Sequence, residues 1–195
     1  MEVAMKKGFA LLLAIGLFCA GCVVQSIKPW LSDATRVGEP SLLGSWHDAK
    51  NDVVAFFTEA SDAKSDYQVL LIGNGKDVLR YAATLHRIDN VLLLEAAPDD
   101  AVNLESCVLL PCHLLFKVVL DGMSLKLHAI DVESFGERAA TAQVPLLPGG
   151  SKNDGYVLTG ATPDSEAFLR AQLADPEFFD EMPLYSFQKL PAAAP

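Results

Sequence analysis

The chain has 195 residues, of which 51% are hydrophobic and 21% are charged, and its formal net charge is −10. This length suits one ordinary domain, and the apolar content excludes a disordered or fibrous chain. The excess of negative charge argues against a protein that binds nucleic acid by electrostatic attraction.

The first 21 residues have the pattern of an export signal. Met5, Lys6 and Lys7 form a short basic region, and residues 9–20 (FALLLAIGLFCA) are an apolar stretch. Such a stretch is typical of a signal peptide and is too short to cross a bilayer as a helix. We therefore expect residues 1–21 to be removed, and no later apolar run in the sequence is long enough to span a membrane.

The end of this segment carries a lipidation motif. Ala20 and Gly21, both small, directly precede Cys22, and this arrangement resembles the lipobox of bacterial lipoproteins. The resemblance implies cleavage before Cys22 and attachment of acyl chains such as palmitate, which would hold the protein at a membrane. The alternative is an ordinary secretory signal followed by an unrelated cysteine. Residue 23 is Val rather than Asp, which in a diderm bacterium implies the outer membrane, with the protein facing the periplasm.

Residues 22–40 show no steady hydrophobic period and contain Pro29, Gly38 and Pro40. We expect a lipidated tether here, which could reach roughly 60 Å if it were fully extended. Whether Trp30 and Leu31 dock on the domain is left open by the sequence. The domain itself is expected over residues 41–190, followed by a disordered tail at 191–195.

From Gly44 onward the hydrophobic period is two, which is typical of half-buried antiparallel strands. We expect about nine strands, near residues 44–48, 53–58, 66–72, 78–87, 91–96, 113–120, 123–131, 155–159 and 184–190. Short connections with turn residues favour a meander of neighbouring strands, and closure into a small up-and-down barrel of eight or nine strands protects its edges.

Two turns predict the register of their hairpins. With Asp89-Asn90 as a two-residue loop, Leu85 faces Leu94 and Ala83 faces Ala96. With Asp121-Gly122 as the other, Val118 faces Leu125, Phe116 faces Leu127, and Lys117 faces Lys126 on the opposite side. Both registers place apolar pairs on one face, so we expect that face to line the barrel interior. The predicted interior residues are Trp46, Tyr81, Ala83, Leu85, Leu94, Ala96, Phe116, Val118, Leu125 and Leu127. Most are bulky, which counts against a large cavity, and Ala83 opposite Ala96 is the one place where small side chains would leave room for a ligand.

Cys107 and Cys112 are five positions apart. In an oxidising envelope compartment such a pair predicts a local disulfide, worth about 2 kcal/mol in the chain-entropy model. Zinc binding together with the adjacent His113 is the alternative, but a zinc site needs three or four protein ligands and no second cysteine pair exists.

Helical signals come late in the chain. Thr162 followed by Pro163 has the pattern of an N-cap with proline in the first turn, and Asp175-Pro176 ends the run. A weaker helix is expected over residues 132–142.

Gly44-Ser45-Trp46 at the start of the first strand resembles the Gly-x-Trp motif of the lipocalins. The order of hairpins, late helix and last strand over residues 41–190 is also similar to the lipocalin-like domains of uncharacterised bacterial lipoproteins. This resemblance implies an up-and-down barrel whose Trp46 closes the base. In any β-barrel, the same tryptophan would be a large buried core residue.

The histidines and lysines of one hairpin could form a basic patch on this acidic protein. The predicted register places His113, Lys117, Lys126 and His128 together on the outer face, where they would suit a phosphate, a lipid headgroup or an acidic glycan. An ordinary solvated barrel exterior is the simpler interpretation.

No set of residues in the sequence converges on a catalytic, metal or cofactor site. We therefore expect a non-catalytic protein without a cofactor, anchored at the cell envelope through Cys22. Two functions remain open. The barrel could bind a small apolar or amphiphilic ligand, or the protein could be an accessory protein that binds another envelope protein through its outer surface. An open interior would favour the first and a filled interior the second.

Overall fold

The computed structural model describes residues 23–61, 65–73, 78–99, 112–148 and 155–191. Its strands are β1 (Val24–Ser26), β2 (Gly44–Asp48), β3 (Val53–Glu59), β4 (Tyr67–Ile72), β5 (Val78–Ile88), β6 (Val91–Pro98), β7 (His113–Asp121), β8 (Ser124–His128), β9 (Leu146–Pro148), β10 (Tyr156–Leu158) and β11 (Tyr185–Lys189). The helices are α2 (Val132–Thr141) and α3 (Thr162–Gln172), with short 3-10 turns η1 (Asp33–Thr35), η2 (Pro40–Leu42) and η4 (Pro176–Phe178). Neither α2 nor α3 has the length and apolar character that a transmembrane helix requires, within the residues described.

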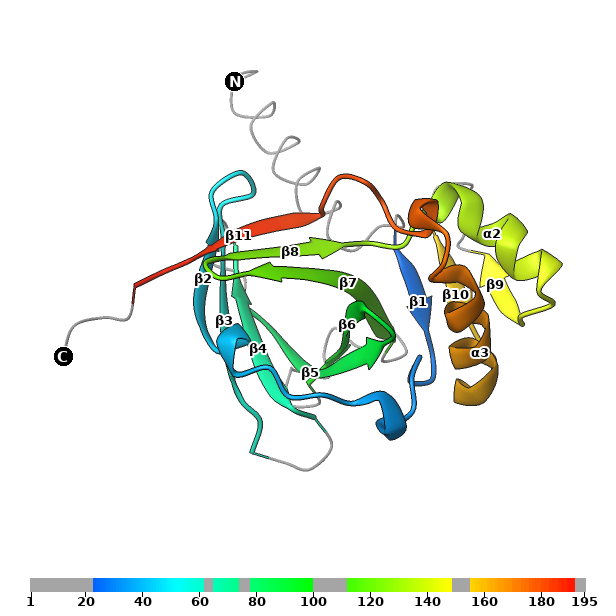
Figure 1. Cartoon of the computed structure of the whole chain (residues 1–195), viewed down its shortest axis with the longest axis horizontal. Coiled ribbons are helices and arrows are strands. Elements are labelled where there is room, and N and C mark those ends of the chain that lie inside the picture. The colour runs from blue at the N-terminus through cyan, green and yellow to red at the C-terminus, as the bar shows by residue number, and fades with distance from the viewer. Residues whose placement is uncertain (1–22, 62–64, 74–77, 100–111, 149–154, 192–195) are drawn as a thin grey trace, which may run out of the picture.

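Eight strands form a closed antiparallel barrel, as the alternating pattern predicted. Strands β2 to β8 pair with their neighbours in chain order, and β11 closes the ring by pairing with both β8 and β2. All eight of these pairings are antiparallel, which allows short connections to join β2 to β3, β3 to β4, β4 to β5, β5 to β6 and β7 to β8. The mainly β fold class is confirmed (Figure 1).

Three further strands and the two helices lie beside the barrel. Strand β1 pairs with the start of β7 on one side and with β10 on the other, and β10 pairs with β9. Figure 1 shows β1 between the barrel and helices α2 and α3. Strands β1 and β9, with three residues each, are too short to give a recognisable alternation and were not predicted.

Both predicted helices are present. Helix α3 begins at Thr162, so the N-cap is Ala161, one residue earlier than expected. The Thr162 hydroxyl instead donates a hydrogen bond to the carbonyl oxygen of Pro29, 2.7 Å away. Helix α2 is capped by Asp131, whose carboxylate accepts hydrogen bonds from the backbone of Glu133 and Ser134.

One predicted hairpin register is confirmed and the other is wrong by two residues. In the β5–β6 hairpin, Leu85 lies opposite Leu94 and Ala83 opposite Ala96. In the β7–β8 hairpin, the loop is Gly122-Met123 rather than Asp121-Gly122. Leu125 therefore faces Leu120, Val118 faces Leu127, and Lys117 faces His128 instead of Lys126. In both hairpins the first loop residue has a positive φ, 51° at Asp89 and 54° at Gly122. Glycine adopts a positive φ at little energetic cost, so the two-residue loop begins at Gly122 rather than at Asp121. A shift of two keeps every side chain on its predicted face.

Residues 24–40, which were expected to belong to a tether, are instead packed against the barrel. Val24, Trp30 and Leu31 are buried. The Glu95 carboxylate on the outer face of β6 accepts hydrogen bonds from the backbone N–H of Trp30 (3.1 Å) and of Leu31 (3.3 Å). Apolar burial together with these two hydrogen bonds outweighs the conformational freedom that a tether would keep.

The buried residues form two separate cores. The inner core lies inside the barrel and includes Trp46, Phe57, Leu85, Leu94 and Phe187. The outer core lies between the barrel wall, β1 and the helices, and includes Trp30, Leu93, Leu115, Phe135 and Phe168. Strands β6 and β7 are therefore covered on both faces, since their alternate side chains belong to different cores.

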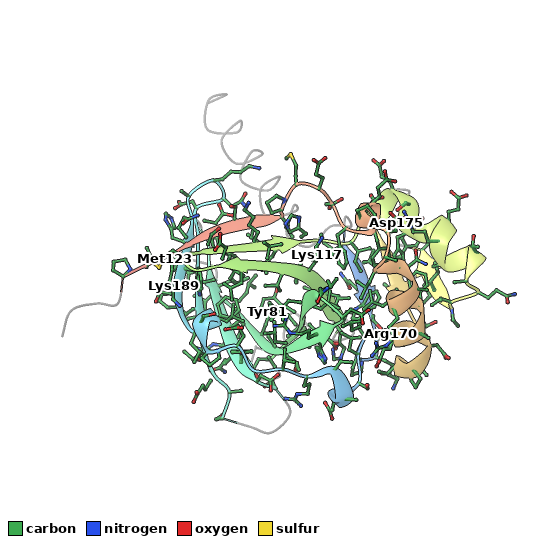
Figure 2. All side chains as sticks on the ribbon, viewed as in Figure 1. Tyr81, Lys117, Met123, Arg170, Asp175 and Lys189 are labelled. Atoms are coloured by element: carbon green, nitrogen blue, oxygen red, sulfur yellow. The ribbon has the colours of Figure 1, made fainter. Side chains whose placement is uncertain are left out.

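One end of the barrel, called here the closed end, is where β2 and β8 begin. The chain crosses it as η2, and the Trp46 indole N–H donates a hydrogen bond to the Leu42 carbonyl oxygen, 2.8 Å away. The Lys189 ammonium lies 4.9 Å from the centre of the Trp46 ring and donates to the Ser41 carbonyl oxygen. Figure 2 shows Lys189 beside Met123 of the β7–β8 loop, away from Arg170 of α3 and from Asp175, which precedes η4.

Candidate functional site

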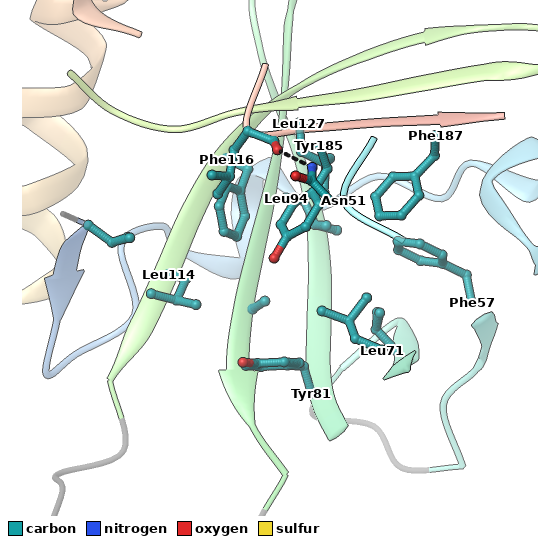
Figure 3. A pocket seen from close by; sticks show the side chains of 14 residues that line it. Asn51, Phe57, Leu71, Tyr81, Leu94, Leu114, Phe116, Leu127, Tyr185 and Phe187 are labelled. Carbon is teal, nitrogen blue, oxygen red and sulfur yellow. Dashed lines mark hydrogen bonds between the residues drawn. The ribbon is translucent and has the colours of Figure 1, made fainter. Parts of the chain in front are cut away.

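A cavity of about 270 Å³ lies inside the barrel toward the opposite end, called here the open end, where the β2–β3 turn lies and where β5 and β11 begin. Its wall is mostly apolar, with three polar side chains (Figure 3). The lining residues are Val23, Asn51, Phe57, Val69, Leu71, Tyr81, Leu94, Ala96, Leu114, Phe116, Leu127, Leu184, Tyr185 and Phe187.

The predicted interior residues divide between this cavity and the packed part of the barrel. Tyr81, Leu94, Ala96, Phe116 and Leu127 line the cavity. Trp46, Ala83, Leu85, Val118 and Leu125 are buried in the inner core nearer the closed end. The small pair Ala83 and Ala96 is therefore split, because only Ala96 belongs to the cavity wall.

Two tyrosine hydroxyls supply polar groups inside this apolar wall. Figure 3 shows Tyr81 and Tyr185 pointing into the cavity from β5 and β11. Burial raises the pKa of Tyr185 to about 12, with smaller contributions from Tyr81 and Asp48. The hydroxyl thus keeps its proton at neutral pH. It is available to donate a hydrogen bond to a ligand.

The β2–β3 turn is clamped to the start of β11 at the cavity mouth. The Asp48 carboxylate accepts hydrogen bonds from the backbone N–H of Lys50 and Asn51, from the Asn51 side chain, and from the N–H of Ser186. Burial acts to raise the pKa of Asp48, but these hydrogen bonds outweigh it and hold the pKa below its ordinary value. The Asn51 amide also donates to the Leu184 carbonyl oxygen, 3.1 Å away, as Figure 3 shows.

Several cavity residues were missed by the sequence interpretation. Val23 was assigned to the tether, and Asn51 and Leu184 lie outside the regular part of any strand. Tyr185 and Phe187 could have been found, because they alternate within a strand that was expected at residues 184–190. The strand lacked a predicted hairpin partner, so nothing in the sequence assigned its faces.

A second group of polar residues lies on the outer barrel wall, beneath residues 30–36. Glu95 is buried there, and its carboxylate lies 2.6 Å from Nδ1 of His113 and 4.0 Å from Nε2 of His86. Nδ1 of His86 lies 2.8 Å from the Thr35 hydroxyl, which donates to the Ser32 carbonyl oxygen. Burial lowers the pKa of His86 below its ordinary value of 6.5, despite nearby carboxylates that act to raise it. These contacts fasten the N-terminal segment to β5, β6 and β7.

Three residues of the predicted basic patch, Lys117, Lys126 and His128, lie on the outer face of the β7–β8 hairpin, with Lys117 directly opposite His128. His113 is paired with Glu95, and the carbonyl oxygen of His113 accepts a hydrogen bond from the Trp30 indole. His128 contacts the Asp180 carbonyl oxygen through Nδ1, and the Lys117 ammonium lies 5.9 Å from the centre of the Phe179 ring. Lys126 is exposed and lies opposite Val119. His113 is covered by the N-terminal segment, whereas the other three residues stay on one outer face of the hairpin.

No family model, curated protein or solved structure matches this chain. Among the described residues, no group of three or more His, Cys, Asp or Glu side chains is arranged to hold a metal ion. Cys112 is half-buried, and burial raises the pKa of its thiol. Its predicted partner Cys107 and the predicted lipidation site Cys22 lie outside the described residues, so the disulfide and the lipid anchor stay predictions.

Proposed function

We propose that this protein is a lipid-anchored protein of the cell envelope whose barrel binds a small apolar or amphiphilic molecule without changing it chemically. The observation that carries this proposal is the cavity, since an interior filled by side chains would have no place for a ligand. The lipobox-like signal that ends at Cys22 supports the location, at the outer membrane of a diderm source.

The size and chemistry of the cavity restrict the ligand. Its volume of about 270 Å³ lies just below the range of roughly 300–1,000 Å³ found for sites of drug-sized molecules. Burial contributes about 25 cal/mol for each Å² of apolar ligand surface, so a slender hydrocarbon chain could bind through the apolar wall alone. The protonated hydroxyl of Tyr185 would contact the polar end of an amphiphile. A fatty acyl chain satisfies both conditions.

The test uses two adjacent alanines of β6 whose side chains point to opposite faces. Ala96 lines the cavity, whereas Ala97 lies on the other face and is half-buried. We expect Ala96→Phe to weaken the binding of a fluorescent fatty acid by about tenfold or more, because the new ring fills the cavity. Ala97→Phe should bind as the unchanged protein does. Both variants are compared by circular dichroism to verify that the barrel has folded.

The titration is performed on protein expressed without residues 1–22, so that no attached acyl chain competes for the cavity. Native mass spectrometry of the acylated protein, extracted from its own membranes, would identify a co-purified lipid. If the unchanged protein shows neither saturable binding nor a co-purified lipid, the ligand-binding proposal is wrong. The function as an accessory protein, which acts through its outer surface, would then be favoured.

A further inference from the structure

The cavity wall includes the residue next to the predicted lipid anchor. Val23 lines the cavity together with Leu184 and Tyr185 of the open end. A single peptide bond joins Val23 to Cys22, so the two Cα atoms are about 3.8 Å apart. Acyl chains attached to Cys22 would therefore leave the protein beside the cavity rather than at the far end of a linker.

Because residues 24–42 pack against the barrel, they cannot extend as a flexible tether between Cys22 and the barrel. Strand β1 is hydrogen-bonded to both β7 and β10, and Trp30 is completely buried. If the lipid is attached at Cys22 and the chain packs against the barrel from Val24 onward, the barrel is held in a restricted orientation relative to the bilayer. With the roughly 60 Å tether expected from sequence, any face of the barrel could have met the lipid.

The open end also presents exposed apolar side chains. Val78 and Leu79 at the start of β5 are 45% and 36% exposed, and Met182 and Leu184 before β11 are 70% and 42% exposed. Exposed apolar side chains gathered around a binding site are typical of surfaces that meet a partner or a membrane. Met123 and Leu190 are also exposed at the closed end, so exposure alone does not indicate which end of the barrel faces the membrane. The position of Val23 in the cavity wall favours the open end.

We infer that the open end of the barrel is a membrane-docking surface. Its partner is a lipid bilayer, and its apolar rim enters the interface between headgroups and acyl chains. The inference rests on acylation of Cys22, and it holds whether or not the cavity takes a ligand. For a ligand-binding barrel, it means that a lipid could pass between bilayer and cavity without crossing water.

The test measures which end of the acylated full-length protein contacts lipid. Both native tryptophans, Trp30 and Trp46, are completely buried, so a tryptophan added at the surface reports on its own surroundings. One is placed at the open end by Leu184→Trp, with Met182→Trp as a second reporter in case the first does not fold. Met123→Trp serves as the matched control at the closed end, where Figure 2 shows Met123. Each variant is reconstituted into phosphatidylcholine vesicles that carry bromine atoms on the acyl chains.

We expect brominated acyl chains to quench the open-end tryptophan by about twofold and to leave the Met123→Trp signal unchanged, because the bromine must come close to the indole. Equal quenching at the two ends, or stronger quenching at Met123→Trp, would overturn the inference. A mature protein whose intact mass shows no acylation would also overturn it. Fatty-acid binding by the form without residues 1–22 is measured separately, so failure of the proposed function is distinguishable from failure of the docking surface.

Discussion

The inner and outer cores are both apolar, but they are packed in different ways. In the outer core, aromatic rings form a continuous set of contacts. Phe135 lies 5.7 Å from Phe168 and 6.4 Å from Trp30 between ring centres, and Phe178 lies 6.0 Å from Phe168. Any side chain added at Gly136 would overlap the hydroxyl of Tyr156, which shows how closely α2 is packed. The inner core contains fully buried side chains near Trp46 but is hollow at the open end.

This difference in packing arises because the elements around the outer core can move closer together, whereas the strands around the inner core cannot. A helix can move toward its neighbours until the rings between them are in contact. The radius of a closed eight-stranded barrel is set by the number and stagger of its strands, so a small inward residue such as Ala96 leaves space that the backbone cannot close. We therefore expect the outer core to contribute more to stability, and the hollow part of the inner core to serve the ligand binding proposed above. Four predictions test this division, from the largest expected effect to the smallest.

Truncation in the outer core should cost much more stability than truncation at the cavity. We expect Phe135→Ala to lower the free energy of unfolding by about 3–5 kcal/mol, because Phe135 is completely buried among other rings. Leu114→Ala should cost less than the roughly 2–5 kcal/mol of an enclosed leucine, since Leu114 already borders the cavity. Urea unfolding of both variants measures the two values. Equal losses would show that the two cores do not differ in packing.

Removing the Glu95 carboxylate should loosen the cover of the outer core. Glu95→Ala leaves the buried N–H groups of Trp30 and Leu31 without their acceptor, at a cost of about 3 kcal/mol in unfolding free energy. The exposed Glu59 on β3 is the matched control, and Glu59→Ala should change stability by less than about 0.5 kcal/mol. Amide hydrogen exchange should become faster in residues 24–31 of Glu95→Ala before it changes in the barrel. An unchanged exchange rate in that segment would contradict the assigned role.

Buried His86 should make stability depend on pH below its ordinary pKa. Because the folded-state pKa of His86 is lowered from 6.5, the unfolded chain binds a proton below about pH 6.5 while the folded protein does not. The free energy of unfolding therefore falls as the pH drops from 6.5 toward the folded-state pKa, by at most about 1.4 kcal/mol per pH unit for one group. His86→Gln should remove this part of the slope. Urea unfolding at several pH values for both proteins tests it, and identical slopes would assign the dependence to other groups.

The smallest effect is expected at Ser165, whose side chain is buried in the outer core within α3. Its hydroxyl has no hydrogen-bond partner among the described residues. Ser165→Ala removes this unpaired group and introduces a better helix former, so we expect a gain of up to about 1 kcal/mol in unfolding free energy. Thermal unfolding would detect it as a higher midpoint. A clear loss of stability would mean that the hydroxyl is hydrogen-bonded in solution, for example to a buried water.

Local patterns in the sequence are sufficient to define the barrel. Alternation along β5, β6, β7 and β8 identifies which side chains share a face, because the period of two is a property of the extended backbone itself. The β5–β6 register follows from the two-residue loop Asp89-Asn90, because the length of the loop fixes which residues of the two strands lie opposite each other. In the β7–β8 hairpin, two loops of equal length both contain Gly122, and the positive φ of that glycine decided between them only in the folded chain.

The site depended on contacts between segments that are distant in the sequence. Val23, Asn51 and Tyr185 come from three separate parts of the chain, and no local pattern relates them. The outward Leu93 and Leu115 indicate that some segment covers β6 and β7, but not that residues 24–31 and two helices do so. The sequence thus determined the closed barrel and its inward face, because strand period and turn chemistry act over a few residues. Tertiary structure alone decided where the barrel is hollow and which end lies beside Val23, because both depend on how the N-terminal segment and β11 pack against strands far from them in the chain.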